Sequence, residues 1–314
     1  MINLKIMSPK ELFRIDGVRT IDLHQYIDKK IIHFINWEEE AVKLIIMNDI
    51  FYRFVVSKKQ LAYKALTIIS CKAQVLHLPI KKLIMVVGNG LVANGFKAYN
   101  DNDTCLVFAS GVSNSSSTDN NAFARERDLL RKTIKEYPGK TLIYCSTCSI
   151  YDPSMQDSPY VKHKLAIETI VKEEHDDYHI FRISNLVGRT DNPHTVLNFF
   201  IQHIISGHFF FLWKNASRNI IDIDDAVAVC DWIIQQQFFK NEVVNVANPV
   251  NYKVTEIIQA IETFLEKKGN YELVDKGINP DIDIQTVKKF FAPLNIQFDK
   301  DYFSRILKKY YTVK

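Results

Sequence analysis

Short apolar runs alternate with amphipathic stretches over residues 82–249. The runs LIMVV, CLVFAS, TLIYCS and YHIFRIS are compact and bounded by turn residues, as buried strands are. Between them, NNAFARERDLLRKTIKEY and SPYVKHKLAIETIVKEE have the spacing of apolar residues that is typical of amphipathic helices. Strands that alternate with helices predict βαβ units, so we expect an α/β fold with a doubly wound, mostly parallel sheet.

The two ends of the chain have a different pattern. Residues 1–80 contain short apolar runs separated by charged stretches, a single glycine at Gly17, and no motif that indicates a function. After Pro249 a new helix is expected near Thr255, which predicts a small, mainly helical C-terminal lobe. The expected organisation is therefore a segment of unknown role (1–80), an α/β domain (81–249) and a smaller lobe that completes the substrate site (250–314).

Composition narrows the class of protein. A chain of 314 residues with 47% apolar and 24% charged positions can bury a full core. The net charge of +4 comes from 40 basic and 36 acidic residues mixed along the chain, which does not favour a nucleic-acid partner. No apolar run reaches the roughly 18 residues of a membrane span, and the N-terminus lacks a signal-peptide pattern. We expect a cytoplasmic protein.

No metal site is predicted. Cys145 and Cys148 have C-x-x-C spacing, which could indicate redox or metal chemistry, but no second cysteine pair accompanies them. Their run, LIYCSTCSIY, has the pattern of a strand end, so we interpret them as reduced core thiols. Asp222, Asp224 and Asp225 are expected to cap the helix that follows them, because carboxylates satisfy open amides at a helix N-terminus.

A glycine turn follows the first predicted strand and opens a helix. In Met85-Val-Val-Gly88-Asn-Gly90-Leu-Val-Ala93, Gly88 would allow a tight turn and Gly90 would let the backbone approach a pyrophosphate. Ala93 would allow close packing of helix on strand. Such turns also occur without any ligand. The predicted dinucleotide contacts here are Gly88, Asn89, Gly90, Leu91 and Val92.

Two strands expected after this turn are missing. Dinucleotide folds place an acidic residue at the end of a second strand, about 20 residues after the glycines, where it binds the adenosine ribose. Here only Phe96 to Thr104 separate the first helix from the next strand, which ends in Ala109-Ser110-Gly111, also predicted to contact the cofactor. Either the adenosine side is open, or residues 1–80 supply the missing strands.

A proton-transfer pair lies on the helix that begins near residue 159. Tyr160 and Lys164 are four residues apart and therefore on one helix face. A tyrosine titrates near pH 10 and exchanges protons poorly at neutral pH unless a positive charge favours its phenolate. Thr147, at the preceding strand end, offers a hydroxyl, and His163 is expected to face solvent. The alternative is that Tyr160 and Lys164 are an ordinary exposed pair on a helix. The order of the motifs along the chain argues against this alternative.

From about Leu83 to Val254 the chain resembles the extended short-chain dehydrogenase/reductases, the NAD-dependent epimerase/dehydratase family, which has a Rossmann-like fold. The matching segments are STCSIYD, the Y-x-x-x-K pair, FRISNLVG, RNIIDIDD and VNVANP. The resemblance assigns Thr147 as the catalytic hydroxyl, Tyr160 as the proton-transferring residue, and Lys164 as the residue that also binds the nicotinamide ribose. It likewise implies that Asn185 contacts the sugar nucleotide and that Arg218 pairs with its diphosphate.

The resemblance implies an NAD- or NADP-dependent enzyme acting on a nucleotide sugar, in surface polysaccharide synthesis, as a homodimer formed by helices near 121–137 and 160–174. Cys148 and Ser149 follow Thr147 where 4,6-dehydratases carry Asp-Glu, which disfavours dehydration and leaves epimerisation or ketone reduction. One alternative is a non-catalytic regulatory or scaffold protein of the same fold that binds a dinucleotide. Another is a fusion in which residues 1–80 carry a separate activity.

Overall fold

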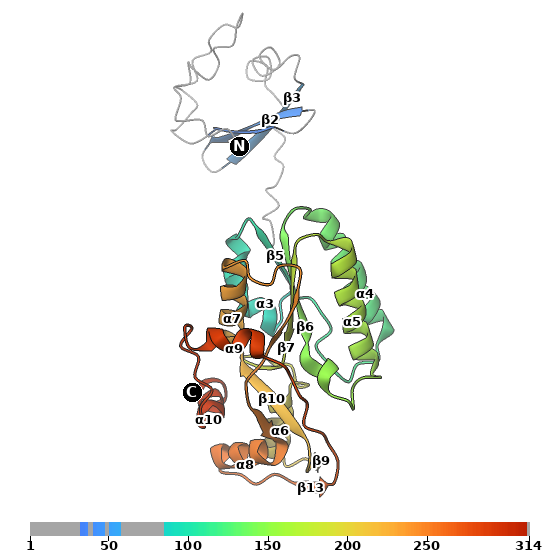
Figure 1. Ribbon diagram of the computed structural model, residues 1–314, viewed down its shortest axis with the longest axis vertical. Coiled ribbons are helices and arrows are strands. Elements are labelled where there is room, and N and C mark those ends of the chain that lie inside the picture. The colour runs from blue at the N-terminus through green and yellow to red at the C-terminus, as the bar shows by residue number, and fades with distance from the viewer. Residues whose placement is uncertain (1–31, 37–39, 48–49, 58–84, 313–314) are drawn as a thin grey trace, which may run out of the picture. The chain divides into compact units, whose positions relative to one another are not determined.

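The computed structural model describes residues 32–36, 40–47, 50–57 and 85–312 (Figure 1). The chain divides into two compact units, Met1–Lys82 and Leu83–Lys314. In the first unit three strands form an antiparallel sheet in the order β1-β2-β3: β1 (Ile32–Asn36), β2 (Glu40–Met47) and β3 (Ile50–Ser57). Most of the segment 1–80 lies outside the described residues, and its role in completing the larger sheet stays a prediction.

A five-stranded parallel sheet forms the centre of the second unit. Its order is β11-β7-β6-β5-β4, and every neighbouring pair is parallel. The strands are β4 (Val86–Val87), β5 (Cys105–Phe108), β6 (Thr141–Thr147), β7 (Tyr178–Ile183) and β11 (Val243–Val246). This sheet, with helices on both faces, confirms the predicted α/β class.

The strand β4 lies at the edge of this sheet. Between β4 and β5 the chain forms only the short helix α3 (Leu91–Gly95) and the 3-10 helix η1 (Lys97–Asp101). Within the described ranges, no strand pairs with the outer side of β4. The atypical first half of the sheet, predicted from the short spacing after the glycine turn, is therefore confirmed for these residues.

Helices cover the two faces of the sheet (Figure 1). The strands alternate their side chains between the faces: Leu142 and Tyr144 of β6 pack toward one face, and Ile143 packs toward the other. Because both faces are covered, the strands are mostly apolar, and β5 consists only of buried apolar residues. The first face carries α4 (Asn120–Glu136) and α5 (Pro159–Glu174), and the second carries α7 (Ile223–Gln235) and α9 (Gln285–Phe291).

Polar side chains fix the starts of the main helices. Asp119 accepts hydrogen bonds from the backbone at the start of α4, Ser158 does so at α5, and Asp222 does so at α7. The predicted capping is thus confirmed for Asp222, whereas the carboxylates of Asp224 and Asp225 accept hydrogen bonds from Lys309 and Tyr302. Pro159 occupies the first turn of α5, where its missing N–H costs nothing.

A second hydrophobic core combines residues 187–220 with residues 254–307. Its helices are α6 (Val196–Ser206), α8 (Val254–Leu265) and α10 (Tyr302–Tyr311). Its strands form two small sheets: β8 (Asn185–Val187) with β10 (Ser217–Asp222) and β12 (Asn251–Lys253), and β9 (Phe210–Trp213) with β13 (Tyr271–Val274). The C-terminal residues therefore share a core with the segment that follows β7.

Candidate active site

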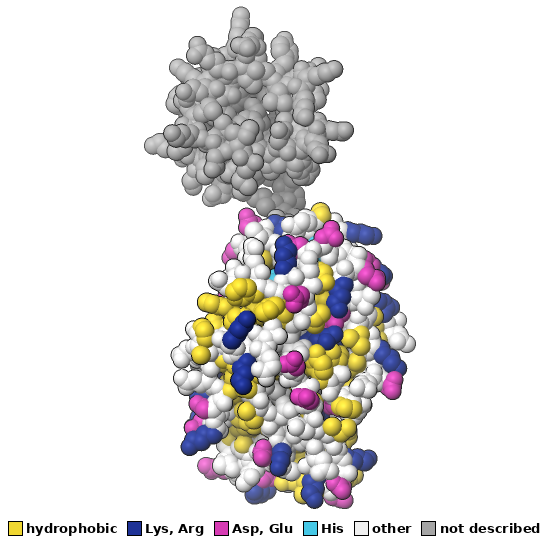
Figure 2. Space-filling model, in the orientation of Figure 1, with side chains coloured by type: hydrophobic (Ala, Val, Ile, Leu, Met, Phe, Trp, Pro, Cys, Tyr) yellow, Lys and Arg dark blue, Asp and Glu magenta, His cyan; other side chains and the backbone are white. Residues whose placement is uncertain are grey.

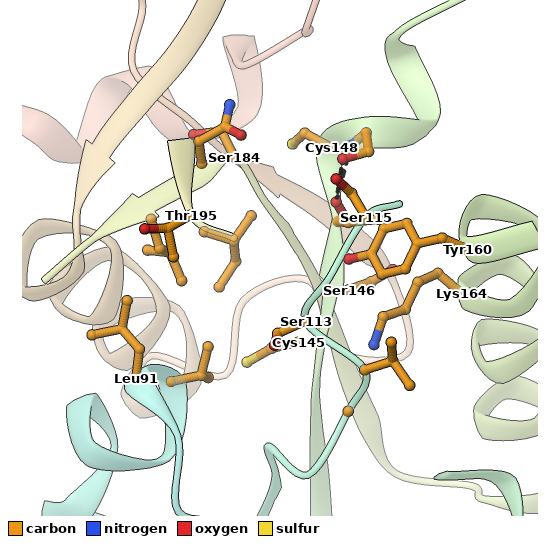
Figure 3. A pocket seen from close by; sticks show the side chains of 18 of the residues that line it. Leu91, Ser113, Ser115, Cys145, Ser146, Cys148, Tyr160, Lys164, Ser184 and Thr195 are labelled. Carbon is orange, nitrogen blue, oxygen red and sulfur yellow. Dashed lines mark hydrogen bonds between the residues drawn. The ribbon is translucent and has the colours of Figure 1, made fainter. Parts of the chain in front are cut away.

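A cavity of about 650 Å³ lies at the carboxyl ends of β4, β5 and β6 (Figure 3). In open α/β sheets this is the edge at which ligands bind. The opposite wall comes from β8, β10 and the loop before α6. The cavity brings together all of the predicted site residues except Gly88: Asn89, Gly90, Leu91, Val92, Ala109, Ser110, Gly111, Thr147, Tyr160, Lys164, Asn185 and Arg218.

The glycine turn packs tightly on one side and is open on the other. Gly88 has φ +136°, and a Cβ there would lie 2.5 Å from the carbonyl oxygen of Ala109, so only glycine fits. A Cβ on Gly90 would meet no atom within 4 Å. Gly90 precedes the first residue of α3 and lines the cavity. The two glycines therefore have different roles: Gly88 makes the tight turn possible, and Gly90 leaves the backbone unobstructed.

Tyr160 and Lys164 reach the cavity from α5 (Figure 3). They are 6% and 4% exposed, and Lys164 Nζ lies 5.8 Å from the centre of the Tyr160 ring. Ser158 caps the helix two residues before Tyr160 and so fixes where the pair begins. Among the described residues, the Tyr160 hydroxyl has no hydrogen-bond partner, while Lys164 Nζ donates to Glu126 Oε1 at 2.9 Å. Tyr160 is therefore free to bond a ligand.

The end of β6 places two hydroxyls at the cavity wall. Thr147 Oγ1 accepts a hydrogen bond from the backbone N–H of Ser149 at 3.0 Å and also lies 3.0 Å from Ser149 Oγ. This capping starts the 3-10 helix η2 (Cys148–Tyr151). Ser146 Oγ instead donates to Glu168 Oε1 at 2.6 Å. Of the two hydroxyls, Thr147 is the one without a charged partner.

The expectation that His163 faces solvent is wrong. The side chain is buried, its Nε2 lies 2.9 Å from Glu126 Oε2, and its ring stacks on Phe123 with centroids 4.4 Å apart. A position three residues after Tyr160 lies close to the buried face of the same helix, so the periodicity of α5 already indicated burial. Glu126 was not predicted, because its contacts with α5 span 37 and 38 residues of sequence.

Three of the recognised motifs supply a hydrogen-bonded network beneath the cavity. Arg182 donates to both carboxylate oxygens of Glu168 at 2.9 and 2.7 Å, and to the Tyr151 hydroxyl at 3.0 Å. Tyr151 in turn donates to Asn245 at 2.9 Å. Burial disfavours the charge on Arg182, but the hydrogen bonds and charge of Glu168 outweigh it and raise the pKa of Arg182. Together with Glu168 of α5, these motif residues connect β7, η2 and β11 through side-chain hydrogen bonds.

Asn185 and Arg218 line the opposite wall. The Asn185 side chain donates to the backbone carbonyl of Asn219 at 2.8 Å, which leaves its own carbonyl oxygen available. Arg218 is half-buried and donates to the carbonyl of Ser217, and no ion pair in the described part of the chain involves it. Burial lowers the pKa of Arg218 despite the nearby charge of Asp152. A partly buried guanidinium of this kind favours an anionic ligand.

The C-x-x-C cysteines are free thiols. Burial raises the pKa of Cys145 to about 12 and raises the pKa of Cys148 as well, so neither is poised as a thiolate. Cys148 donates to the carbonyl of Arg182. Across residues 85–312, no group of three or more His, Cys, Asp or Glu side chains is placed to bind a metal ion. No helix in the same range is long and apolar enough to cross a membrane.

The chain was compared with known proteins. Residues 97–247 match the model of the NAD dependent epimerase/dehydratase family, and a search of curated proteins found no significant sequence match. Among solved structures, the chain is similar to UDP-glucuronic acid 4-epimerase from Bacillus cereus in complex with UDP-glucuronic acid and NAD. The TM-score is 0.52 at 17% identity, over 69% of this chain and 77% of that one.

Two further structures have the same fold. One is UDP-N-acetylglucosamine 4-epimerase from Methanobrevibacter ruminantium M1 in complex with UDP-N-acetylmuramic acid, with TM-score 0.50 and 20% identity over 69% of this chain and 77% of that one. The other is RMD from Pseudomonas aeruginosa complexed with NADPH, with TM-score 0.50 and 13% identity over 65% and 80%. At these identities the structures show a shared fold, and the family model confirms the predicted resemblance.

Proposed function

We propose that the chain is an NAD(P)-dependent enzyme that oxidises or reduces a carbon of a nucleotide sugar, which the match of residues 97–247 to the NAD dependent epimerase/dehydratase family supports. The observation that carries the proposal is the convergence of the glycine turn, Thr147, Tyr160 and Lys164 on one cavity. These residues come from three separate segments of the chain: the turn after β4, the end of β6, and α5. Epimerisation and ketone reduction both fit this set.

The shape of the glycine turn suits the pyrophosphate of a dinucleotide. Gly90 presents backbone without a side chain toward the cavity, and the first amides of α3 follow it directly. Residues 109–111 would lie along the same ligand, and Lys164 would bond its nicotinamide ribose. When bound, NAD or NADP supplies hydride acceptance or donation at the nicotinamide ring.

The opposite wall suits the sugar nucleotide. Arg218 is the partly buried cation on that wall, and a planar guanidinium matches the oxygens of a diphosphate. Asn185 offers an amide oxygen beside it. The sugar would then lie between this wall and the Thr147–Tyr160 side of the cavity. The UDP-sugar complexes of two structural neighbours support this class of substrate.

The protein's own groups move the proton and hold the oxygen. For oxidation, the Tyr160 hydroxyl, ionised to the phenolate, takes the proton of the sugar hydroxyl, while Thr147 donates a hydrogen bond to the same oxygen. In reduction, Tyr160 gives the proton back. Lys164 Nζ lies 5.8 Å from the centre of the Tyr160 ring, so the ammonium and the phenol can contact the same ligand. The buried setting strengthens each of these interactions.

A non-catalytic dinucleotide-binding protein is the second candidate. The edge position of β4 favours it, because the strands that normally hold the adenosine ribose do not pair there among the described residues. The Tyr160 hydroxyl favours the enzyme, because it belongs to a residue that lines the cavity beside Thr147 and Lys164 and has no partner among the described residues. The homodimer and the role in surface polysaccharide synthesis stay predictions.

Calorimetric titration of the full chain with NAD, NADH, NADP and NADPH tests the proposal. Gly90→Asp should abolish binding, because the added carboxylate would occupy the open side of the turn and repel a pyrophosphate. Asn94→Asp adds the same charge on the exposed side of α3, outside the cavity, and should bind normally. If wild type binds none of the four, the enzyme proposal fails; saturable binding opens a screen of UDP- and dTDP-sugars.

A further inference from the structure

A buried carboxylate that the proposed mechanism does not use lies behind Lys164. Glu126 of α4 is fully buried, and its Oε1 lies 2.9 Å from Lys164 Nζ. Its Oε2 lies 2.9 Å from His163 Nε2 and accepts a hydrogen bond from the Val112 N–H at 2.7 Å. The Tyr144 hydroxyl is 3.3 Å from Oε1. A charge buried this deeply persists only where such partners compensate it.

The Glu126–Lys164 pair supports the cavity wall directly. A Cβ placed on Gly111 would lie 2.5 Å from Lys164 Nζ and 2.8 Å from Glu126 Oε1. The backbone at 111–112 therefore rests on the ion pair, and Val112 is hydrogen-bonded to it. Because residues 109–112 line the cavity, the wall and the ammonium are positioned by one carboxylate.

His163 fixes which oxygen of Glu126 faces Lys164. Its Nδ1 is buried without a partner, so the hydrogen-bond pattern assigns the proton to Nε2, which donates to Oε2. Stacking on Phe123 holds the ring in place. With Oε2 occupied by His163 and Val112, Oε1 is left for the ammonium.

We propose that Glu126 is the positioning residue of Lys164. An ammonium has three donors, and among the described residues Lys164 Nζ has one hydrogen-bond partner, Glu126. The pairing fixes one donor behind the wall and directs the other two toward a ligand in the cavity. The inference rests on the proposed function, since the ligand it concerns is the dinucleotide. Glu126 itself does not line the cavity.

A double-mutant cycle on NADH affinity tests this role in the full chain. The variants are Glu126→Gln, which keeps the shape and removes the charge, Lys164→Met, and the two combined. Each single variant should weaken NADH binding roughly tenfold, the order expected for one charge-assisted hydrogen bond. Because Glu126 acts through Lys164, the double variant should bind no more weakly than Lys164→Met. Asp128→Asn, exposed on the same helix, is the matched control and should bind as wild type.

The outcomes separate the two proposals. The positioning role is overturned if Glu126→Gln binds NADH as wild type does. It is also overturned if Glu126→Gln weakens NADH binding by the same factor in the wild-type and Lys164→Met backgrounds, because a general loss of structure would have that effect. If wild type binds no dinucleotide, the proposed function fails instead. The free energy of unfolding of the same variants then tests the pairing. The double variant should be more stable than Lys164→Met alone, because Glu126→Gln removes the charge left without a partner. If the two single substitutions change the free energy of unfolding additively, the pairing is overturned.

Discussion

The polar side chains on the β6–α5 side of the cavity differ in what else they bond. Thr147 is tied to Ser149, and Lys164 is tied to Glu126. The Tyr160 hydroxyl has no partner among the described residues, although its side chain is almost fully buried. Tyr160 lines the cavity, so a hydroxyl there without a protein partner can bond a bound substrate hydroxyl directly. Tyr160 is therefore the residue best placed to exchange a proton with a ligand.

Tyr160→Phe should remove turnover and leave cofactor binding intact. The substitution deletes only the hydroxyl, so we expect kcat to fall roughly 10²- to 10⁴-fold, the usual contribution of a positioned acid or base. NADH affinity, measured by fluorescence titration, should stay at the wild-type value. Tyr271→Phe, in the second core, is the control with full activity. Retention of wild-type kcat by Tyr160→Phe would exclude the phenol from proton transfer.

Glu126 should make the protein sensitive to acid. Burial disfavours its ionised form, but the hydrogen bond from His163 and the charge of Lys164 outweigh burial and lower its pKa from 4.5 to about 2. A carboxylate with a depressed folded-state pKa stabilises the protein above its unfolded pKa and loses that contribution as pH falls toward the folded value. The contribution is roughly 3 kcal/mol above pH 4.5.

Urea unfolding of wild type and Glu126→Gln from pH 7 to pH 2.5 measures this. The difference in free energy of unfolding between the two proteins should be largest near neutral pH and should shrink below pH 4.5. His163, Lys164 and Tyr144 are the titratable groups that face Glu126, and all three are present in both proteins. A difference that is independent of pH over this range would contradict a charged Glu126.

At the scale of elements, a buried ion pair joins α5 to β7. Glu168→Gln should destabilise the protein by roughly 3 kcal/mol, because it leaves the Arg182 guanidinium without its carboxylate partner. Glu174, near the end of the same helix, pairs with Arg131 in a solvent-exposed contact. Glu174→Gln should cost at most about 1 kcal/mol. Equal changes in the two denaturation midpoints would show that burial does not strengthen the Glu168 pair.

The site could be predicted from sequence where it depends on strand order. Parallel strands end at one edge of a sheet, so the glycine turn, residues 109–111 and Thr147 had to meet, and the capped helix start placed Tyr160 beside them. Contacts between distant helices leave no such pattern. Glu126 occupies one polar position among many on α4, and only the packing of α4 on α5 shows that it is buried against Lys164.

The sequence pattern also could not predict the small sheets of the second core. β10 pairs with β8, 35 residues earlier, through Ile220 opposite Asn185, and β13 pairs with β9 across α8. Strands of three or four residues carry too little periodicity to identify their partners. These pairings nevertheless build the wall that carries Arg218 and Asn185, so the substrate side of the cavity depends on the less predictable half of the unit.

At the scale of the whole molecule, the position of β4 at the edge of the sheet leaves the two halves of the cavity with unequal walls. In the proposed binding mode, the nicotinamide half would have walls from β5, β6, α5 and the second core, whereas the adenosine half would lie beside a strand of two residues followed by α3 and η1. On the face of that unit shown in Figure 2, charges of both signs are scattered without a single-signed patch. Binding energy for a dinucleotide should therefore concentrate in its nicotinamide half.

Competition against NADH tests this asymmetry in the full chain. Nicotinamide mononucleotide should displace NADH at a lower concentration than ADP does, because the described cavity-lining residues gather around the glycine turn, Lys164 and the wall between them. In a dinucleotide fold with both halves, an acidic residue on the second strand gives the adenosine ribose its own partner. Titrated directly into the Gly90→Asp variant, neither compound should bind as it does to wild type, since each carries a phosphate for the turn. If ADP competes better, adenosine contacts come from outside residues 85–312, and a chain comprising residues 83–314 should then lose its preference for ADP.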